Sequence, residues 1–128
     1  MKKHVGLKID SILEKGFRSR FVGDFEKSIS LTDEINKIKN ENILKMCDII
    51  LNSNDNSIVI EKEYKKRIGN LYESKNNKIL GGVTCNTIRI IFGINRNRGY
   101  LYFKNAFPIP YKGFDEKHDR LEYTIFPQ

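Results

Sequence analysis

The clearest pattern in the chain is an alternation of apolar and polar residues within 87–107. Apolar residues occupy every second position of 88–94, the two-residue period of a strand with one buried face. Residues 95–99 read Asn-Arg-Asn-Arg-Gly, and asparagine and glycine accept the positive φ angles of tight turns. A second alternating stretch begins at Tyr100. The segment is therefore predicted to be a β-hairpin.

The second face of this hairpin carries the candidate chemistry. The apolar faces agree when Ile94 pairs with Gly99, and that register puts Arg89 opposite Lys104, with Tyr102 on the same side. Directly opposed like charges repel each other unless an anion lies across them. Single-stranded nucleic acid offers both an anion and stacking bases. A solvated face with tyrosines chosen for their β propensity is the alternative interpretation.

A helical pattern precedes the hairpin. Isoleucine and methionine recur at helical spacing over 35–50, after acidic residues that suit a first turn. This pattern predicts one amphipathic helix of about 20 residues packed on the sheet. Cys47 is expected to be a small core residue of that helix.

Shorter patterns predict the remaining elements. Strands are predicted at 5–9, 57–60 and 68–73, a turn or bulge within 76–82, and a short helix within 115–123. In the strand at 68–73, Leu71 is expected to point inward and Tyr72 outward. Pro108 is expected to end the last strand, because proline cannot donate to a ladder. The predicted fold class is α+β, with an N-terminal strand and helices packed on one face of a small antiparallel sheet of about four strands.

Length and charge narrow the classes of function. A chain of 128 residues suits a single domain, 1–128. The net charge of +7 favours a phosphate-rich or acidic partner. The two cysteines have no cysteine or histidine at ligand spacing, so neither a zinc site nor a disulfide framework is expected. No apolar run approaches the roughly 20 residues that span a bilayer, and a cytoplasmic location is expected; a domain excised from a larger secreted toxin would look the same.

Three strings resemble segments of the RelE/HigB toxin superfamily. Residues 66–73 are similar to its basic segment leading into a Leu-Tyr-Glu-like strand, and 88–92 to its Tyr-Arg-Ile-Leu-Tyr-like strand. Residues 100–107 are similar to the family strand that ends in a small residue and Phe. The resemblance covers roughly 31–107. It departs from the family at Asn105, where many HigB-like members have His, and after residue 107, where their Lys-Lys-Thr-like run is absent.

The resemblance implies a metal-independent endoribonuclease that cuts mRNA on the ribosome and needs no cofactor. In that reaction the ribose 2′-OH attacks the adjacent phosphate, so the site needs a base, cations for the phosphorane charge and an acid for the leaving oxygen. The resemblance assigns phosphate stabilisation to Arg89, and Lys104 is the second cation. His118 is the candidate acid or base. Substrate contacts are expected from Lys66, Arg67, Tyr72, Tyr102 and Lys112.

The implied partners are RNA, the ribosome and an acidic antitoxin or immunity protein, with no membrane partner. Two other functions stay open. One is a toxin nuclease of the barnase–EndoU–colicin–RelE group that cuts tRNA without ribosomes. The other is a non-catalytic RelE/ParE-like inhibitor that only binds nucleic acid or protein, and the altered family positions favour it.

Overall fold

The computed structural model describes residues 17–75 and 78–115. Within these residues the chain forms two α-helices, one 3-10 helix and six strands. In chain order they are β1 (Phe17–Phe21), η1 (Gly23–Glu26), α2 (Ser28–Glu41), α3 (Ile43–Asn52), β2 (Ser57–Glu63), β3 (Gly69–Lys75), β4 (Lys78–Cys85), β5 (Thr87–Asn95) and β6 (Tyr100–Ile109). The strand predicted at 5–9 and the helix predicted beyond residue 115 lie outside the described residues.

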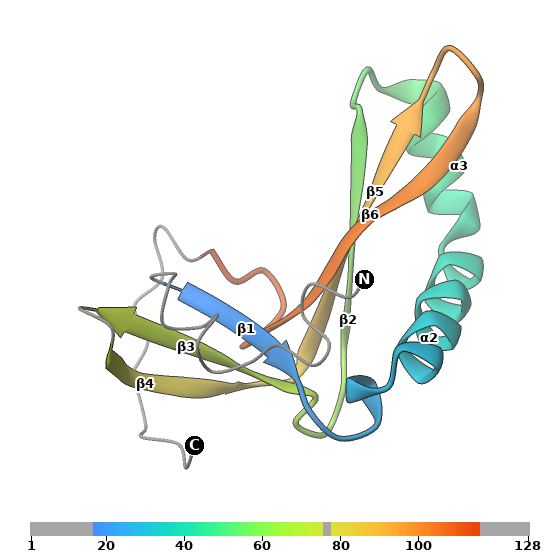
Figure 1. Ribbon diagram of the computed structural model, residues 1–128. Coiled ribbons are helices and arrows are strands. Elements are labelled where there is room, and N and C mark those ends of the chain that lie inside the picture. Colours follow the sequence, from blue (N-terminus) through green and yellow to red (C-terminus); the bar gives the residue numbers. More distant parts are fainter. Residues whose placement is uncertain (1–16, 76–77, 116–128) are drawn as a thin grey trace.

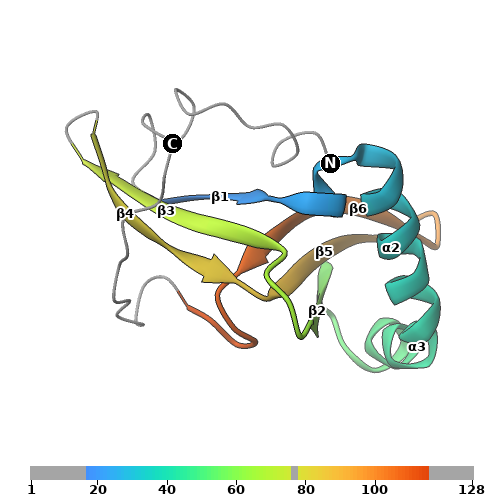
Figure 2. The same cartoon turned by 90° about the horizontal axis from the view of Figure 1, so that it is seen from below.

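The α+β class is confirmed, but the single sheet of about four strands is wrong. The described strands form two three-stranded antiparallel sheets, ordered β1-β3-β4 and β2-β5-β6. In Figure 1 the β2-β5-β6 sheet stands upright with α2 and α3 along one side, and the β1-β3-β4 sheet projects from its lower end on the other side. Figure 2 shows the same separation from below. The connections from β2 to β3 and from β4 to β5 both lie at the bend between the sheets (Figure 1).

The main core lies between the helices and the β2-β5-β6 sheet. On α2 the buried residues Leu31, Ile35 and Ile38 recur at helical spacing, and α3 adds Met46. They pack against Ile58, Ile60, Ile88, Ile90, Phe92 and Ile94 of the sheet. Burial of one such side chain stabilises the fold by about 1.5–3 kcal/mol, so this layer fixes which face of the sheet stays open.

A polar contact also joins α2 to β2 and the residue that follows it. The Tyr64 hydroxyl donates to Glu34 Oε1 at 2.5 Å, and Lys62 Nζ lies 3.4 Å from the same oxygen. Burial raises the pKa of Glu34, but the hydrogen bonds from Tyr64 and Lys62 and the charges of Lys62 and Lys37 outweigh it, so the net shift is downward. The carboxylate is therefore held in its charged form.

The predicted long helix is two helices. Asn42, with φ −113° and ψ 16°, separates α2 from α3. Its side-chain Nδ2 donates to the carbonyl of Ile38 at 2.7 Å. The backbone N–H of Asn42 also donates to this carbonyl, and to that of Lys39, at 3.2 Å, so Asn42 caps the end of α2 with both its side chain and its backbone. The periodicity of the apolar residues continues across the break, which is why the pattern alone indicated one helix.

The hairpin is confirmed, but its predicted register is wrong. The four-residue turn spans 96–99 instead of 95–98, with Asn95 paired to Tyr100, so Ile94 lies opposite Leu101 instead of Gly99. A register shift between Ile91 and Phe92 then leaves Lys104 as the extra residue of a β-bulge. Beyond the bulge, Arg89 pairs with Phe107. Arg89 and Lys104 are therefore not cross-strand neighbours.

Of three further expectations, two need correction. β6 continues through Pro108 to Ile109, because an edge strand has an outer side on which no ladder donor is needed. The turn or bulge expected within 76–82 is confirmed as a bulge, because Glu73 pairs with Gly81 and Ser74 with Ile79, which leaves Leu80 unpaired; the strand β4 around it was not predicted. Tyr72 is only 6% exposed, and its neighbour Leu71 is 5% exposed; because adjacent residues point to opposite faces, both faces of β3 are covered here and the expected outward position of Tyr72 is wrong.

Candidate nucleic-acid interface

The open face of the β2-β5-β6 sheet is the candidate site. On β5 the residues that face the helices are Ile88, Ile90, Phe92 and Ile94. Because side chains alternate along a strand, Arg89, Ile91 and Gly93 lie on the opposite face. We call this surface the outer face. From the bend to the tip its cross-strand rows are Glu61–Arg89–Phe107, Val59–Ile91–Asn105, Ser57–Gly93–Tyr102 and Asn95–Tyr100.

Two tyrosines cover the tip end of the outer face. Tyr100 is 48% exposed and Tyr102 44% exposed, and their ring centroids lie 6.2 Å apart with an interplanar angle of 63°. The Tyr102 ring lies against Gly93, where any Cβ atom would overlap it. Asn95 Nδ2 donates to the Tyr100 hydroxyl at 3.1 Å. The rings are thus held in place while still offering surface on which a base can stack.

The bend end of the outer face is occupied by an ion pair. Arg89 Nε donates to Glu61 Oε2 at 2.5 Å, and Arg89 Nη2 donates to the carbonyl of Phe114 at 2.6 Å. Glu61 Oε1 accepts a hydrogen bond from the backbone N–H of Gly113 at 2.7 Å. The Arg89 and Glu61 side chains are 22% and 13% exposed. We call this arrangement the Arg89 clamp, because it holds residues 113–114 against the sheet.

The clamp changes the electrostatic argument. The sequence indicated two opposed cations that needed an external anion. In the structure Glu61 lies directly opposite Arg89 on β2 and supplies that anion. Lys104 is exposed on β6 and forms no ion pair within the described residues. It is therefore the predicted catalytic cation whose charge is available to a ligand.

The other predicted site residues are not gathered around Lys104. Lys66 and Arg67 are exposed in the connection from β2 to β3, at the bend (Figure 1), and Lys66 Nζ lies 4.0 Å from Asp24 in a surface pair of small energetic weight. Lys112 is exposed beyond β6. The buried Tyr72 hydroxyl accepts a hydrogen bond from Asn70 Nδ2 at 3.0 Å.

Tyr72 therefore presents no open ring face for stacking a base. His118 lies outside the described residues. The structure brings Tyr102 and Lys104 together on one strand, separates them from Arg89 by the bulge, and leaves Lys66 and Arg67 at the far end of the sheet.

Sequence reasoning missed two contributors to the outer face. Gly93 could have been found from the sequence, because it is the one glycine in a predicted strand of otherwise large residues. Glu61 was harder to find from the sequence, because it lies just after the strand predicted at 57–60. Only the observed pairing of β2 with β5 places it beside Arg89.

The described residues contain no group of three or more His, Cys, Asp or Glu side chains that could hold a metal ion. Within the same residues, no helix is long and apolar enough to cross a membrane.

The fold is that of an α+β protein with two three-stranded sheets, one of which exposes a pair of tyrosines. No protein-family model matches the chain, and no characterised protein matches its sequence. A solved structure that is similar is a chain from the crystal structure of the CdiA-CT/CdiI complex of Y. kristensenii 33638. The TM-score is 0.65 at 16% sequence identity, and the match covers 85% of this chain and 96% of that chain. At this identity the likeness shows a shared fold.

Proposed function

We propose that the chain is a toxin-like, metal-independent endoribonuclease whose outer face holds single-stranded RNA. The observation that carries the proposal is the exposed, fixed tyrosine pair at the start of β6. The same strand carries Lys104, which is exposed and forms no ion pair within the described residues, and the chain has a net charge of +7. Base stacking on an aromatic ring contributes about 1–3 kcal/mol per base, and the cation contributes phosphate attraction that salt weakens.

The proposed roles follow the positions of the side chains. Tyr100 and Tyr102 stack bases, and Lys104 stabilises charge on the phosphate during attack by the 2′-OH. Arg89 could reach the phosphate only if its guanidinium left Glu61, so we assign it first to the clamp. His118 remains the proposed acid or base.

Three further cations complete the proposed interface. Lys66, Arg67 and Lys112 are exposed beyond the bend end of the sheet and are proposed to contact the RNA backbone on that side of the cleaved bond.

The similar fold in the CdiA-CT/CdiI complex, which pairs a toxin with its immunity protein, supports a toxin-like role with a protein inhibitor. Because this chain is strongly basic, we infer that such an inhibitor is acidic. The proposed site of action is the cytoplasm, on mRNA bound to ribosomes, with free tRNA as the alternative substrate.

A second candidate function is binding without cleavage. It is favoured by Asn105, which occupies the position of the family histidine, and by Glu61, which neutralises Arg89. In this case the same face would hold RNA or a protein and block its use.

The test is cleavage by the purified full chain in EDTA, with three substrates in parallel: a short end-labelled RNA, tRNA, and mRNA on ribosomes. The proposal expects cuts with 2′,3′-cyclic phosphate ends, which Lys104→Ala reduces in a protein that remains folded. Bound but intact RNA would support the binding function. Absence of both binding and cleavage on all three substrates would refute the proposal.

A further inference from the structure

Helix α3 is apolar over a wider arc than the protein's own core covers. Met46 is fully buried, and Ile49 and Ile50 are partly buried against the core. Projected at 100° per residue, the apolar arc continues past Ile50 onto the solvent side. The residues of this exposed arc are Ile43, Leu44, Cys47 and Leu51.

The exposure of this arc is unusual for a small protein. Leu44 is 83% exposed and Leu51 80% exposed, and Ile43 is 44% exposed. Cys47 is also exposed, so the expectation that it lies in the core is wrong. A single exposed leucine needs no explanation, but a contiguous apolar surface on one helix marks an interaction site.

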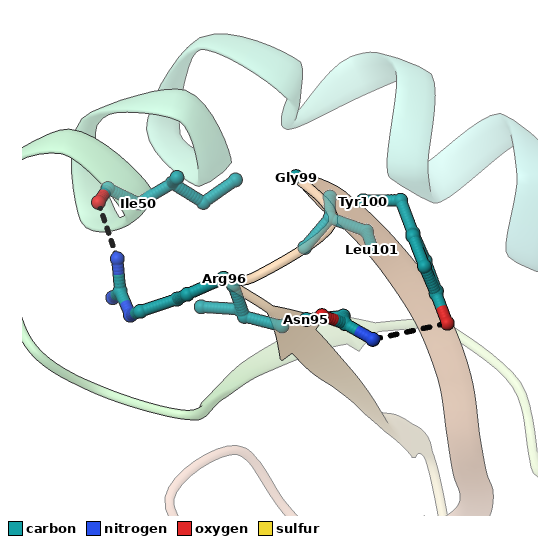
Figure 3. Close-up of a pocket in the computed structure, with 7 residues that line it drawn as sticks. Ile50, Asn95, Arg96, Gly99, Tyr100 and Leu101 are labelled. Carbon is teal, nitrogen blue, oxygen red and sulfur yellow. Dashed lines mark hydrogen bonds between the residues drawn. The ribbon is translucent and has the colours of Figure 1, made fainter.

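A cavity of about 350 Å³ continues the arc toward the hairpin tip, and Ile50 belongs to both. Its apolar wall is formed by Ile50, Ile94 and Leu101, and Tyr100 and Arg96 stand at its rim. Figure 3 shows the cavity between α3 and the start of β6, with Arg96 reaching the end of the helix. The arc and the cavity together form one apolar surface, which we call the α3 surface.

The end of the α3 surface next to the hairpin turn carries two arginines, Arg96 and Arg98. Arg96 donates to the carbonyls of Ile50 and Ser53 at 2.8 Å and of Asp55 at 2.7 Å. These partners are neutral, so the contacts hold the guanidinium without cancelling its charge. Arg98 is exposed in the same turn, and neither arginine forms a salt bridge within the described part of the chain.

We infer that the α3 surface docks an acidic protein, which covers the two leucines, inserts an apolar side chain into the cavity and places carboxylates beside Arg96 and Arg98. RNA would gain nothing from covering leucines. A second copy of this chain would bring another +7 charge to a contact that already carries Arg96 and Arg98, and the two basic chains would repel each other. The identification of the occupant as an immunity-type protein rests on the proposed function; the docking surface itself does not.

The test uses Cys47 as a built-in reporter. The chain has two cysteines, and Cys85 is fully buried, so a benzophenone maleimide will label Cys47. The labelled full chain is photo-cross-linked in extracts of cells that carry its gene. The captured protein is identified by mass spectrometry, purified and titrated against the unlabelled chain. The inference expects a protein with an acidic isoelectric point, whose binding weakens as salt is raised.

Matched variants decide whether the contact is the one inferred. Leu44→Gln with Leu51→Gln should weaken binding at least about 30-fold with an unchanged melting temperature, because both side chains are exposed. Ile29→Gln is the control, since Ile29 is 80% exposed on α2 outside the α3 surface, and it should leave affinity within about twofold.

Three outcomes would overturn the inference: no cross-link, a cross-link only to a second copy of this chain, or binding that the double leucine variant leaves unchanged. Cleavage of RNA is measured separately. Leucine-dependent docking without cleavage would refute only the proposed function, and cleavage without docking would refute only this inference.

Discussion

The Arg89 clamp gives the sharpest prediction, because two roles of Arg89 lead to opposite results. As a clamp, Arg89 acts through Glu61 and the carbonyl of Phe114. As a free phosphate ligand, it would act through its charge and would not need Glu61. The variants that separate these roles are Arg89→Ala, Glu61→Ala and the double variant, with Lys104→Ala as the control.

The magnitude follows from burial and geometry. The two side chains are 22% and 13% exposed, so the pair is mostly, but not fully, removed from water. Breaking a fully buried pair costs about 3–5 kcal/mol, and the remaining solvent access reduces this to about 2–3 kcal/mol for either single variant. For a domain of this size each kcal/mol shifts the melting temperature by about 4 °C. We therefore expect a decrease of about 8–12 °C.

The assay is chemical unfolding of all four variants, combined with RNA cleavage at a temperature at which each is folded. In the double variant the loss should be smaller than the sum of the single losses by at least about 1 kcal/mol, the signature of a direct pair. Lys104→Ala should change stability by less than about 0.5 kcal/mol but reduce cleavage. The clamp would be refuted if Glu61→Ala left stability unchanged and only Arg89→Ala abolished cleavage. That result would restore Arg89 as the phosphate ligand.

Three further predictions concern single side chains. Tyr102→Ala should weaken binding of single-stranded RNA about 5- to 150-fold, because one stacking surface is lost, whereas Tyr102→Phe should bind within about threefold; equal loss in both would contradict stacking. Gly93→Ala should displace the Tyr102 ring, whose atoms occupy the space of the new Cβ, and should weaken RNA binding in a variant whose unfolding curve still shows a folded protein. Unchanged RNA binding would show that the position of the Tyr102 ring does not matter. Glu34→Gln should cost about 1 kcal/mol at pH 7. Because the pKa of Glu34 is lowered in the fold from its ordinary value of 4.5, this difference is present above pH 4.5 and should vanish as pH falls through the lower folded value; a difference that persists at pH 2 would contradict the charge-based explanation.

The elements with a clear periodicity were predictable because periodicity is a local property, whereas β1 and β4 were not predicted. The alternation over 87–107 located β5 and β6, and the helical spacing located α2 and α3 apart from the break at Asn42. The division into two sheets could not be predicted, because it depends on pairings between strands distant in sequence, such as β1 with β3.

The candidate site was predicted less well than the fold, for a related reason. The hairpin register determined the expected pair of Arg89 and Lys104, and a turn displaced by one residue together with one bulge at Lys104 separated them. The partner of Arg89 is Glu61, twenty-eight residues earlier in the chain, and no local pattern links them. Tyr102 was predicted correctly as an exposed residue because its position depends only on alternation within one strand.

The most direct test of the central claim is the chemistry of the RNA ends that the full chain produces in EDTA. The account predicts fragments with 2′,3′-cyclic phosphate and 5′-hydroxyl ends, formed without added metal and reduced at least about tenfold by Lys104→Ala. RNA that stays intact, or fragments with 3′-hydroxyl and 5′-phosphate ends, would contradict it.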